Sequence, residues 1–510
     1  MNSSASSPAL HDDANVLDSS TESFDQGLLA TDESAPDVLS SDASGSITQD
    51  IDISTTDILN ADTKDSSARR EKVRSYLTDA RVLPYCFTSP TKQARAERSQ
   101  KIAQLRIAFL EKSFSILGWL FFCNGLSTVL NENEAILKLL RYTILLVSSL
   151  LLAVRWRATL KAITKGRLLW PVIALMLLSV GWSISPSYTV DSIRGEVLPM
   201  TTFALYFASR FNMREQMRMV AVVLGIGALL SLFYAVAVPS VGKHIGGEFD
   251  GAWKGIYAQK NNFSTTMTMT MMVFFVMGLV NRDRQEKRLA RGGLFFSVAM
   301  ILLSTSKSGL IIFITMSIVV VLSRVFRWKG RRSILVLDVG GMFLLALGAV
   351  LSVTWQTIVI GLGKDPTLSA RTYIWSGSID KIMAQPLLGY GRAAFWVPDS
   401  RPAWEVGALA SKGFVPAHAH NGFIDAALEI GLLGLGLLLL GLLVTYGMAL
   451  RRAYNSQEPE DLWPFTFLTL MVMSNMTETV LITRTSPYWV MYMVVFLSMR
   501  IWPRRTGQSA

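Results

Sequence analysis

Cysteine is scarce in this 510-residue chain, and its scarcity limits the chemistry to be expected. The two cysteines, Cys86 and Cys123, show neither the spacing of a disulfide framework nor that of metal ligands. The sequence also lacks a Walker A motif, a GxGxxG motif ahead of a strand and a nucleophile elbow. We therefore expect no metal site and no cofactor, and no chemistry of the nucleotide-binding or serine-hydrolase classes.

Acidic residues are outnumbered, but the formal net charge of +11 does not indicate a nucleic-acid partner. The basic residues cluster in short segments between apolar runs, as the positive-inside rule expects, and no basic face carries base-stacking aromatics. A cleavable signal peptide is not expected either, because the first apolar run begins near Phe114. The first span should therefore act as an internal anchor.

Long apolar runs fill most of the chain, half of whose residues are hydrophobic. Runs near 20 residues without period-two alternation predict spanning helices rather than barrel strands. We predict an all-α membrane protein with about twelve transmembrane helices. They are expected near 113–130, 136–154, 168–184, 196–209, 217–238, 263–280, 292–305, 308–323, 333–357, 421–450, 462–481 and 487–502.

Charge in the connecting segments predicts the topology in an inner membrane. Residues 292–323 could form one long helix, but basic stretches flank them on both sides and should face the cytoplasm together. We therefore predict two short spans with a tight turn at 304–309, which places Lys307 at its outer tip. An even number of spans leaves both termini in the cytoplasm.

Five segments are predicted. Residues 1–67 are rich in Ser, Asp and Thr and form a disordered acidic tail, because this composition cannot bury a core. Residues 68–112 form a basic juxtamembrane segment that faces anionic lipids. Residues 113–502 form the membrane domain, and 503–510 a cytoplasmic C-terminus. Within the membrane domain, 358–420 is a long, partly helical periplasmic loop, whose length suggests function.

Histidine is the residue type best able to move a proton near neutral pH, and the chain has only four. His418 and His420 lie where the long loop enters a predicted span. If His420 begins that helix, it faces the bundle interior together with a row of small residues. His420 is thus a candidate catalytic base; the alternative is that it only caps the helix.

Basic residues on the outer side depart from the charge rule and therefore need a reason. Lys260, Lys307 and Arg371 all fall in outer segments. Such cations could bind a phosphate, Arg through paired hydrogen bonds and Lys as a point charge. Individually each could equally be a solvated or snorkelling side chain. Glu478 lies near the outer surface too, where an ordinary anchoring role is expected.

Four residues at the loop-to-helix junction resemble a known motif. His420-Asn421, followed after nine residues by Gly431 and Gly434, is similar to the H-[NSQ]-x9-G-x-x-G pattern of O-antigen ligases. The segments 369–375 and 385–391 and the pair Lys260-Asn261 resemble further stretches of the same superfamily. The chain looks closest to the exopolysaccharide-production (ExoQ-like) branch of the O-antigen ligase/polymerase (Wzy-C) superfamily, over about residues 110–500.

The resemblance implies a GT-C-type helical bundle and a metal-independent glycosyltransferase that uses polyprenyl-pyrophosphate-linked sugar donors. His420 would accept or orient the proton of the acceptor hydroxyl. The substrate-binding residues would be Arg371, Lys307, Lys260, Asn261 and Asn421, and Gly431 and Gly434 would be structural. The implied partners are the lipid-linked oligosaccharide and membrane lipids, with room for a co-polymerase or chain-length regulator and no nucleic acid.

Alternatives remain open at this point. Ligases of the superfamily carry an Arg three residues before a Leu on the outer side, where this chain has Lys307 and Leu310. This departure leaves a polymerase that builds exopolysaccharide or O-antigen as the favoured reading, and a ligase as its alternative. A polysaccharide transporter or flippase is a candidate of another class, although its polar residues would be expected near the membrane midplane.

Overall fold

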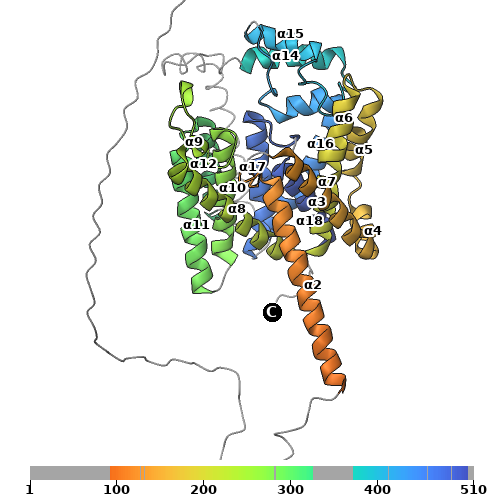
Figure 1. Cartoon of the computed structure of the whole chain (residues 1–510), viewed down its shortest axis with the longest axis vertical. Coiled ribbons are helices and arrows are strands. Elements are labelled where there is room, and N and C mark those ends of the chain that lie inside the picture. The colour runs from red at the N-terminus through yellow and green to blue at the C-terminus, as the bar shows by residue number, and fades with distance from the viewer. Residues whose placement is uncertain are drawn as a thin grey trace, which may run out of the picture. The chain divides into compact units, whose positions relative to one another are not determined.

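The computed structural model describes residues 92–502, except 127, 131–132, 281–282, 326–370, 412, 456–457 and 484. These residues are folded as helices joined by short connections, and their only strand-like pairing is an isolated bridge between Lys243 and Trp253 (Figure 1). The predicted all-α class is confirmed. The acidic tail, the predicted span 333–357 and the C-terminal segment lie outside the described residues.

The bounds of the helices are as follows. They are α2 (Lys92–Phe122), α3 (Glu134–Val154), α4 (Trp156–Lys165), α5 (Trp170–Leu178), α6 (Pro186–Ser192), α7 (Leu198–Arg210), α8 (Met213–Ala237), α9 (Pro239–Gly242), α10 (Lys260–Val280), α11 (Arg284–Leu303), α12 (Lys307–Val325), α14 (Arg371–Ala384), α15 (Arg401–Ala410), α16 (Gly422–Asn455), α17 (Leu462–Thr477) and α18 (Pro487–Ile501). Short helical turns occur at η1 (Ser179–Gly181), η2 (Ile193–Val197), η3 (Gly247–Phe249) and η4 (Pro459–Asp461).

Four described helices are long and apolar enough to cross a membrane, namely α3, α8, α10 and α16. The bent pair formed by α4 and residues 170–181, with 93° between its halves, raises the number to five if it is one span. The first 13 residues of α12 and the whole of α18 are apolar but shorter. The chain is a multi-pass membrane protein, and the total of about twelve spans stays a prediction.

The core surrounds α18, in which every residue from Tyr488 to Met499 is buried. A helix that is apolar on all sides is stable only when other helices cover it. Neighbouring α7 packs against it, and α7 in turn holds aromatic contacts to α2. The Trp119 ring lies 5.9 Å from that of Phe203 and 5.6 Å from that of Phe207, in edge-to-face geometry that favours aromatic pairs.

The predicted split of 292–323 is confirmed. Helix α11 ends at Leu303 and α12 begins at Lys307. Thr305 between them has a left-handed backbone (φ 50°), which reverses the chain within three residues. Lys307 therefore stands at the first position of α12, as the tight turn requires.

Helix α16 is broken at Gly431, whose backbone (φ 69°, ψ 179°) is accessible only to glycine. The break frees backbone groups that would otherwise bond within the helix. The connection after α14 satisfies them: the Leu432 N–H donates to Pro386 O (2.7 Å), and the Tyr390 N–H donates to Leu428 O (2.7 Å). The segment 385–391 and the helix break at Gly431 are thus one structural unit.

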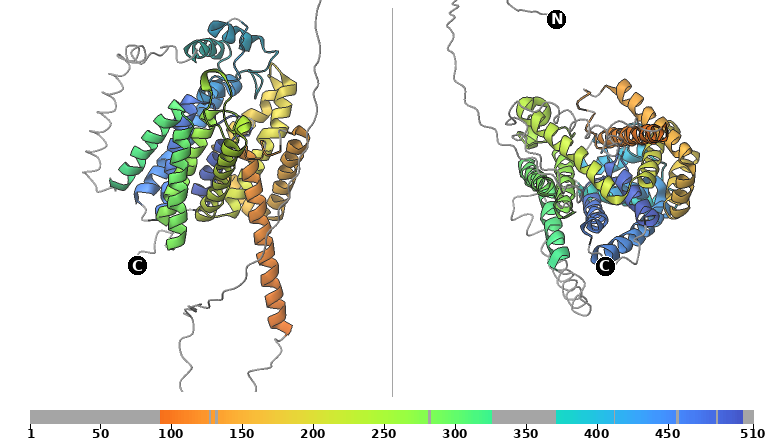
Figure 2. Two further views of the ribbon diagram at one scale, coloured as in Figure 1. Left: turned by 60° about the vertical axis from the view of Figure 1, so that its left-hand side comes forward. Right: turned by 90° about the horizontal axis from the view of Figure 1, so that it is seen from below.

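The described part of the long loop contains α14 and α15, so the prediction that it is partly helical is confirmed. These two helices pack together at one end of the bundle (Figures 1 and 2). The basic N-terminal half of α2 extends from the opposite end in both views. The site described next lies where the connection from α15 enters α16.

Candidate active site

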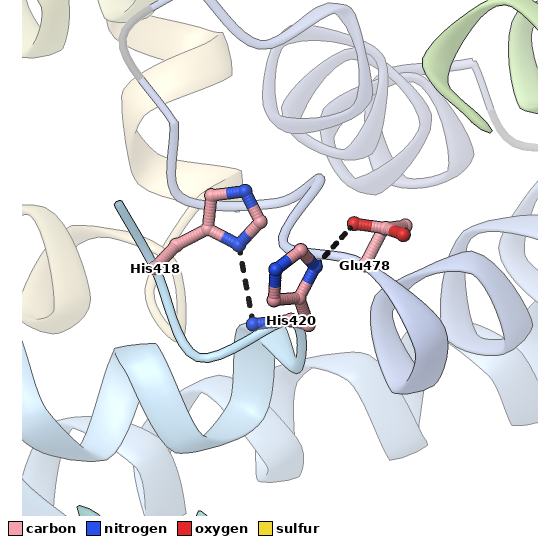
Figure 3. Close-up of side chains that lie close together, drawn as sticks. All are labelled: His418, His420 and Glu478. Carbon is pink, nitrogen blue, oxygen red and sulfur yellow. Dashed lines mark hydrogen bonds and ion pairs between the residues drawn. The ribbon is translucent and has the colours of Figure 1, made fainter. Parts of the chain in front are cut away.

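Three hydrogen bonds from distant parts of the chain meet at the carboxylate of Glu478, directly after α17. Arg371 Nη2 at the start of α14 and Asn261 Nδ2 at the start of α10 both donate to Oε1, each at 2.9 Å. His420 Nδ1 lies 3.0 Å from Oε2 (Figure 3). Glu478 therefore brings together three residues that the sequence predicts as site residues, namely Arg371, Asn261 and His420.

The backbone around His420 explains how its ring reaches Glu478. Helix α16 begins at Gly422, and Asn421 caps it, because Asn421 Oδ1 accepts from the Phe423 and Ile424 N–H groups. His420 has a left-handed backbone (φ 53°), which is costly for a residue with a Cβ. The expectation that His420 begins or caps the helix is wrong. It lies in a strained turn before the helix, as functional residues often do.

The charge on Glu478 determines which nitrogen of His420 carries the proton. Burial alone would raise the pKa of Glu478, but the hydrogen bond from His420 and the charges of His420 and Arg371 hold it below its ordinary value. An ionised carboxylate can only accept, so whenever the His420 ring carries a single proton, that proton lies on Nδ1 and the lone pair on Nε2. This arrangement prepares His420 to accept a proton at Nε2.

His418 has the opposite tautomer. Its Nδ1 accepts a hydrogen bond from the backbone N–H of His420 at 3.1 Å, and the two rings lie 4.2 Å apart, edge to face (Figure 3). Burial and the neighbouring His420 lower the pKa of His418 to about 4. At neutral pH His418 is therefore uncharged, with its single proton on Nε2, and it can donate a hydrogen bond from there.

Further hydrogen bonds fix the side chains of Arg371 and Asn261. Arg371 Nη1 also donates to Thr477 O (2.7 Å), which fixes its guanidinium beside Glu478. Asn261 Oδ1 accepts from Ser306 Oγ (2.8 Å), which connects the site to the turn that precedes Lys307. Lys260 is directed elsewhere, because its Nζ lies 3.9 Å from the centre of the Phe249 ring.

A second carboxylate, Asp425 in the first turn of α16, builds the wall beside the histidines. It accepts from the Ala419 N–H (3.1 Å), from Trp396 Nε1 (2.7 Å) and from Thr479 Oγ1. These bonds fix the turn that carries His418 and His420 against the segment that carries Glu478. Asp425 is 2% exposed, so it acts as an internal support rather than as a surface charge.

Two cavities open beside the histidines. The Lys254 cavity has a volume of about 680 Å³, and the Trp396 cavity has a volume of about 910 Å³. Both are lined by His418, Thr479 and Thr483. Glu478 lines the Lys254 cavity only, and Asp425 lines the Trp396 cavity only. His418 therefore stands at the wall between two separate spaces, each large enough for a sugar unit or more.

The side chains of His418, His420 and Glu478 offer one ligand atom each within 4.8 Å of one another, which is close enough for a candidate metal site. Both oxygens of Glu478 are already hydrogen-bonded, and the Arg371 guanidinium lies 2.9 Å from one of them. A fixed positive charge at that distance opposes a second cation. The donor set fits a hydrogen-bonded proton-transfer site better than a metal site.

Sequence reasoning missed the roles of Glu478, Asp425 and Trp396. The sequence predicts only an anchoring role for Glu478, because nothing in its local sequence points to His420. A carboxylate close to a predicted outer surface, followed by polar threonines, was the available signal. Gly431 forms the helix break described above. Gly434 packs close to the Ile430 side chain, as expected of a structural glycine.

Comparison with known proteins places the site in a family context. The profile described as "O-Antigen ligase" matches residues 292–439, which include Arg371, His420 and both glycines of the motif. The exopolysaccharide production protein ExoQ of Rhizobium meliloti (strain 1021) is 27% identical over 332 residues, covering 61% of this chain and 71% of that protein. A putative polysaccharide ligase of Rickettsia prowazekii (strain Madrid E) is 33% identical over 79 residues, 15% of this chain and 20% of that protein.

Proposed function

We propose that this member of the O-antigen ligase and ExoQ-like family is a glycosyltransferase that polymerises polyprenyl-pyrophosphate-linked oligosaccharide in exopolysaccharide or O-antigen synthesis. Its site would face the periplasm, with both termini in the cytoplasm and about twelve spans in the inner membrane. The name of ExoQ, which is an exopolysaccharide production protein, supports this direction. A co-polymerase or chain-length regulator is a proposed partner.

The observation that carries the proposal is the pairing of His420 with Glu478 and of Glu478 with Arg371. Glycosyl transfer to a hydroxyl needs a group that removes a proton and a group that stabilises the departing diphosphate. The unprotonated Nε2 of His420 supplies the first. Arg371 and Lys307 supply the positive charge that stabilises the departing diphosphate. They take the place that a metal ion fills in other transferases.

The proposed step balances without a further reactant. The acceptor hydroxyl loses its proton to His420 Nε2 while its oxygen forms a bond to the anomeric carbon of the donor sugar. The bond from that carbon to the diphosphate oxygen breaks, and the lipid diphosphate leaves with the electron pair. The imidazolium then formed is stabilised by Glu478 and later releases its proton to solvent. Direct displacement would invert the anomeric configuration.

The test uses the purified full-length chain in lipid nanodiscs with undecaprenyl-pyrophosphate-linked repeat units, in the presence of EDTA. We expect longer lipid-linked chains, resolved by gel electrophoresis and mass spectrometry. His420→Ala and Arg371→Ala should each lower the rate about 100-fold or more. If both variants, at equal protein level, make lipid-linked glycans of unchanged length, the catalytic assignment is refuted.

Two other products would redirect the proposal. Transfer of the glycan to a lipid A-core acceptor, without longer lipid-linked chains, would indicate a ligase, the activity for which the matching family and the Rickettsia relative are named. Movement of the lipid-linked sugar between leaflets without a new glycosidic bond would instead indicate a flippase.

A further inference from the structure

The two cavities beside His418 differ in their charged groups. Five carboxyl side chains line the Trp396 cavity, against three cations, Lys138, Arg141 and Arg392. In the Lys254 cavity one lysine, Lys254, faces one carboxylate, Glu478, which pairs with Arg371. An anionic diphosphate is therefore disfavoured in the first space and better tolerated in the second.

Two of the three cations that line the Trp396 cavity are paired with carboxylates. Arg392 is 3% exposed and lies between Glu429 (2.7 Å) and Glu196 (3.0 Å). Lys138 pairs with Glu134 at 3.0 Å. Arg141 is the one lining cation for which the described residues supply no ion pair. A single guanidinium among several carboxyl groups is a poor site for a doubly charged phosphate group.

The same cavity has the features of a saccharide site. Trp396 and Tyr188 both line it, and aromatic faces pack against the apolar faces of sugar rings. The hydrogen bond from Trp396 Nε1 to Asp425 holds the indole in one orientation, which lowers the entropy lost on binding. Carboxyl groups such as that of Asp191 accept hydrogen bonds from sugar hydroxyls.

We propose that the Trp396 cavity binds the acceptor saccharide, and that the diphosphate end of the donor occupies the Lys254 cavity on the other side of His418, where Glu478, the partner of Arg371, forms part of the lining. The assignment rests on the proposed glycosyl transfer, which needs donor and acceptor to meet beside the base His420, whose ring lies 4.2 Å from that of His418. His418 Nε2–H, at the shared wall, positions a substrate oxygen by a hydrogen bond. The acceptor is thus a hydroxyl-rich glycan end.

The test measures binding to the full-length chain in nanodiscs by isothermal titration calorimetry. The first probe is an oligosaccharide released by partial acid hydrolysis of the producing cell's own exopolysaccharide, and the second is inorganic pyrophosphate. Tyr188→Ala and Trp396→Phe should weaken oligosaccharide binding about tenfold and leave pyrophosphate binding unchanged. Lys254→Gln should do the reverse. Tyr142→Ala, an exposed tyrosine of α3 that lines neither cavity, is the matched control.

Several outcomes would overturn the assignment. These are weaker pyrophosphate binding in Arg141→Gln or Tyr188→Ala, unchanged oligosaccharide binding in both aromatic variants, and no oligosaccharide binding to the unaltered chain. Binding needs no turnover, so the two proposals can fail separately. If the protein shows this binding pattern but forms no glycosidic bond, the subsite assignment stands and the transferase proposal fails. If it is an active transferase without this binding pattern, only the subsite assignment fails.

Discussion

Glu478 is the residue through which the parts of the site are connected. Its side chain is 5% exposed, and it accepts hydrogen bonds from α10, α14 and the turn before α16. Burying the Glu478 carboxylate costs little free energy of folding, because its charge is paired with Arg371 and hydrogen-bonded to His420. Removing that charge should therefore affect the histidine and the arginine together.

Replacing Glu478 by glutamine tests this connection. The glutamine amide nitrogen can donate to His420 Nδ1, which favours the tautomer with the proton on Nε2 and removes the base. We expect kcat to fall about 100-fold or more, with a smaller change in KM. Glu405→Gln on α15 is the matched control, because Glu405 is 46% exposed and its ion-pair partners among the described residues are Lys381 and Arg401. Equal activity of the two variants would contradict the proposed role.

The low pKa of His418 makes the stability of the protein depend on pH. An unfolded histidine binds a proton near pH 6.5, whereas folded His418 does so only near pH 4. The unfolded state binds more protons between these values, so the free energy of unfolding should fall as the pH falls from 6.5 toward 4. Thermal unfolding in detergent measures this.

A variant isolates the contribution of His418 to that pH dependence. His418→Gln keeps a hydrogen-bond acceptor for the His420 N–H but cannot titrate in this range. Its unfolding temperature should change less between pH 6.5 and pH 4.5 than that of the unaltered chain. If both proteins lose stability equally, His418 is not held neutral by its surroundings.

At the scale of elements, the broken helix α16 and the connection after α14 depend on each other. A Cβ added at Gly431 would lie 2.0 Å from Leu387 O, and the backbone there is in a region that only glycine occupies readily. The glycines of the motif are therefore not equivalent. At Gly434 the backbone is helical, and the added atom would lie 2.5 Å from Cγ1 and 2.7 Å from Cβ of Ile430.

Three alanine variants along α16 test this difference. Gly431→Ala should destabilise the protein by about 3 kcal/mol or more and abolish activity, because strain and the clash with Leu387 add. Gly434→Ala should have a smaller effect. Gly436→Ala, where an added Cβ meets nothing within 4 Å, should be neutral or slightly stabilising. Melting temperatures in detergent would rank the three, and a tolerated Gly431→Ala would contradict the proposed docking.

At the scale of the whole molecule, topology decides whether the site can meet a periplasmic substrate. Basic connections at one end of the bundle predict that this end is cytoplasmic, and α14 and α15 lie at the other. The prediction of an even number of spans then requires both termini on the cytoplasmic side.

Reporter fusions test the topology directly. Green fluorescent protein should fluoresce at both termini, and alkaline phosphatase inserted next to Gly413, in the connection between α15 and α16, should be active in the periplasm. Alkaline phosphatase at the C-terminus should be inactive. The opposite pattern at either terminus would mean an odd number of spans and would require a different placement of the site.

The helical membrane class, the hairpin at 304–309, the partly helical loop and the resemblance to O-antigen ligases could be predicted from the sequence. These properties follow from local composition and charge, since apolar runs must form helices in lipid and basic loops stay inside. The positions of His420, Arg371 and Asn261 as candidates also came from sequence, through a motif and through charges in unusual places.

Which of these residues meet follows from the packing of the helices. Glu478, Asp425 and Trp396 carry no local signature, because their roles arise from contacts between segments 29 to 217 residues apart in the chain. The same holds for the break at Gly431, which a helical periodicity predicts as continuous. Long-range hydrogen bonds leave no mark on the periodicity of either partner, so the proton-transfer geometry emerges only when the helices pack.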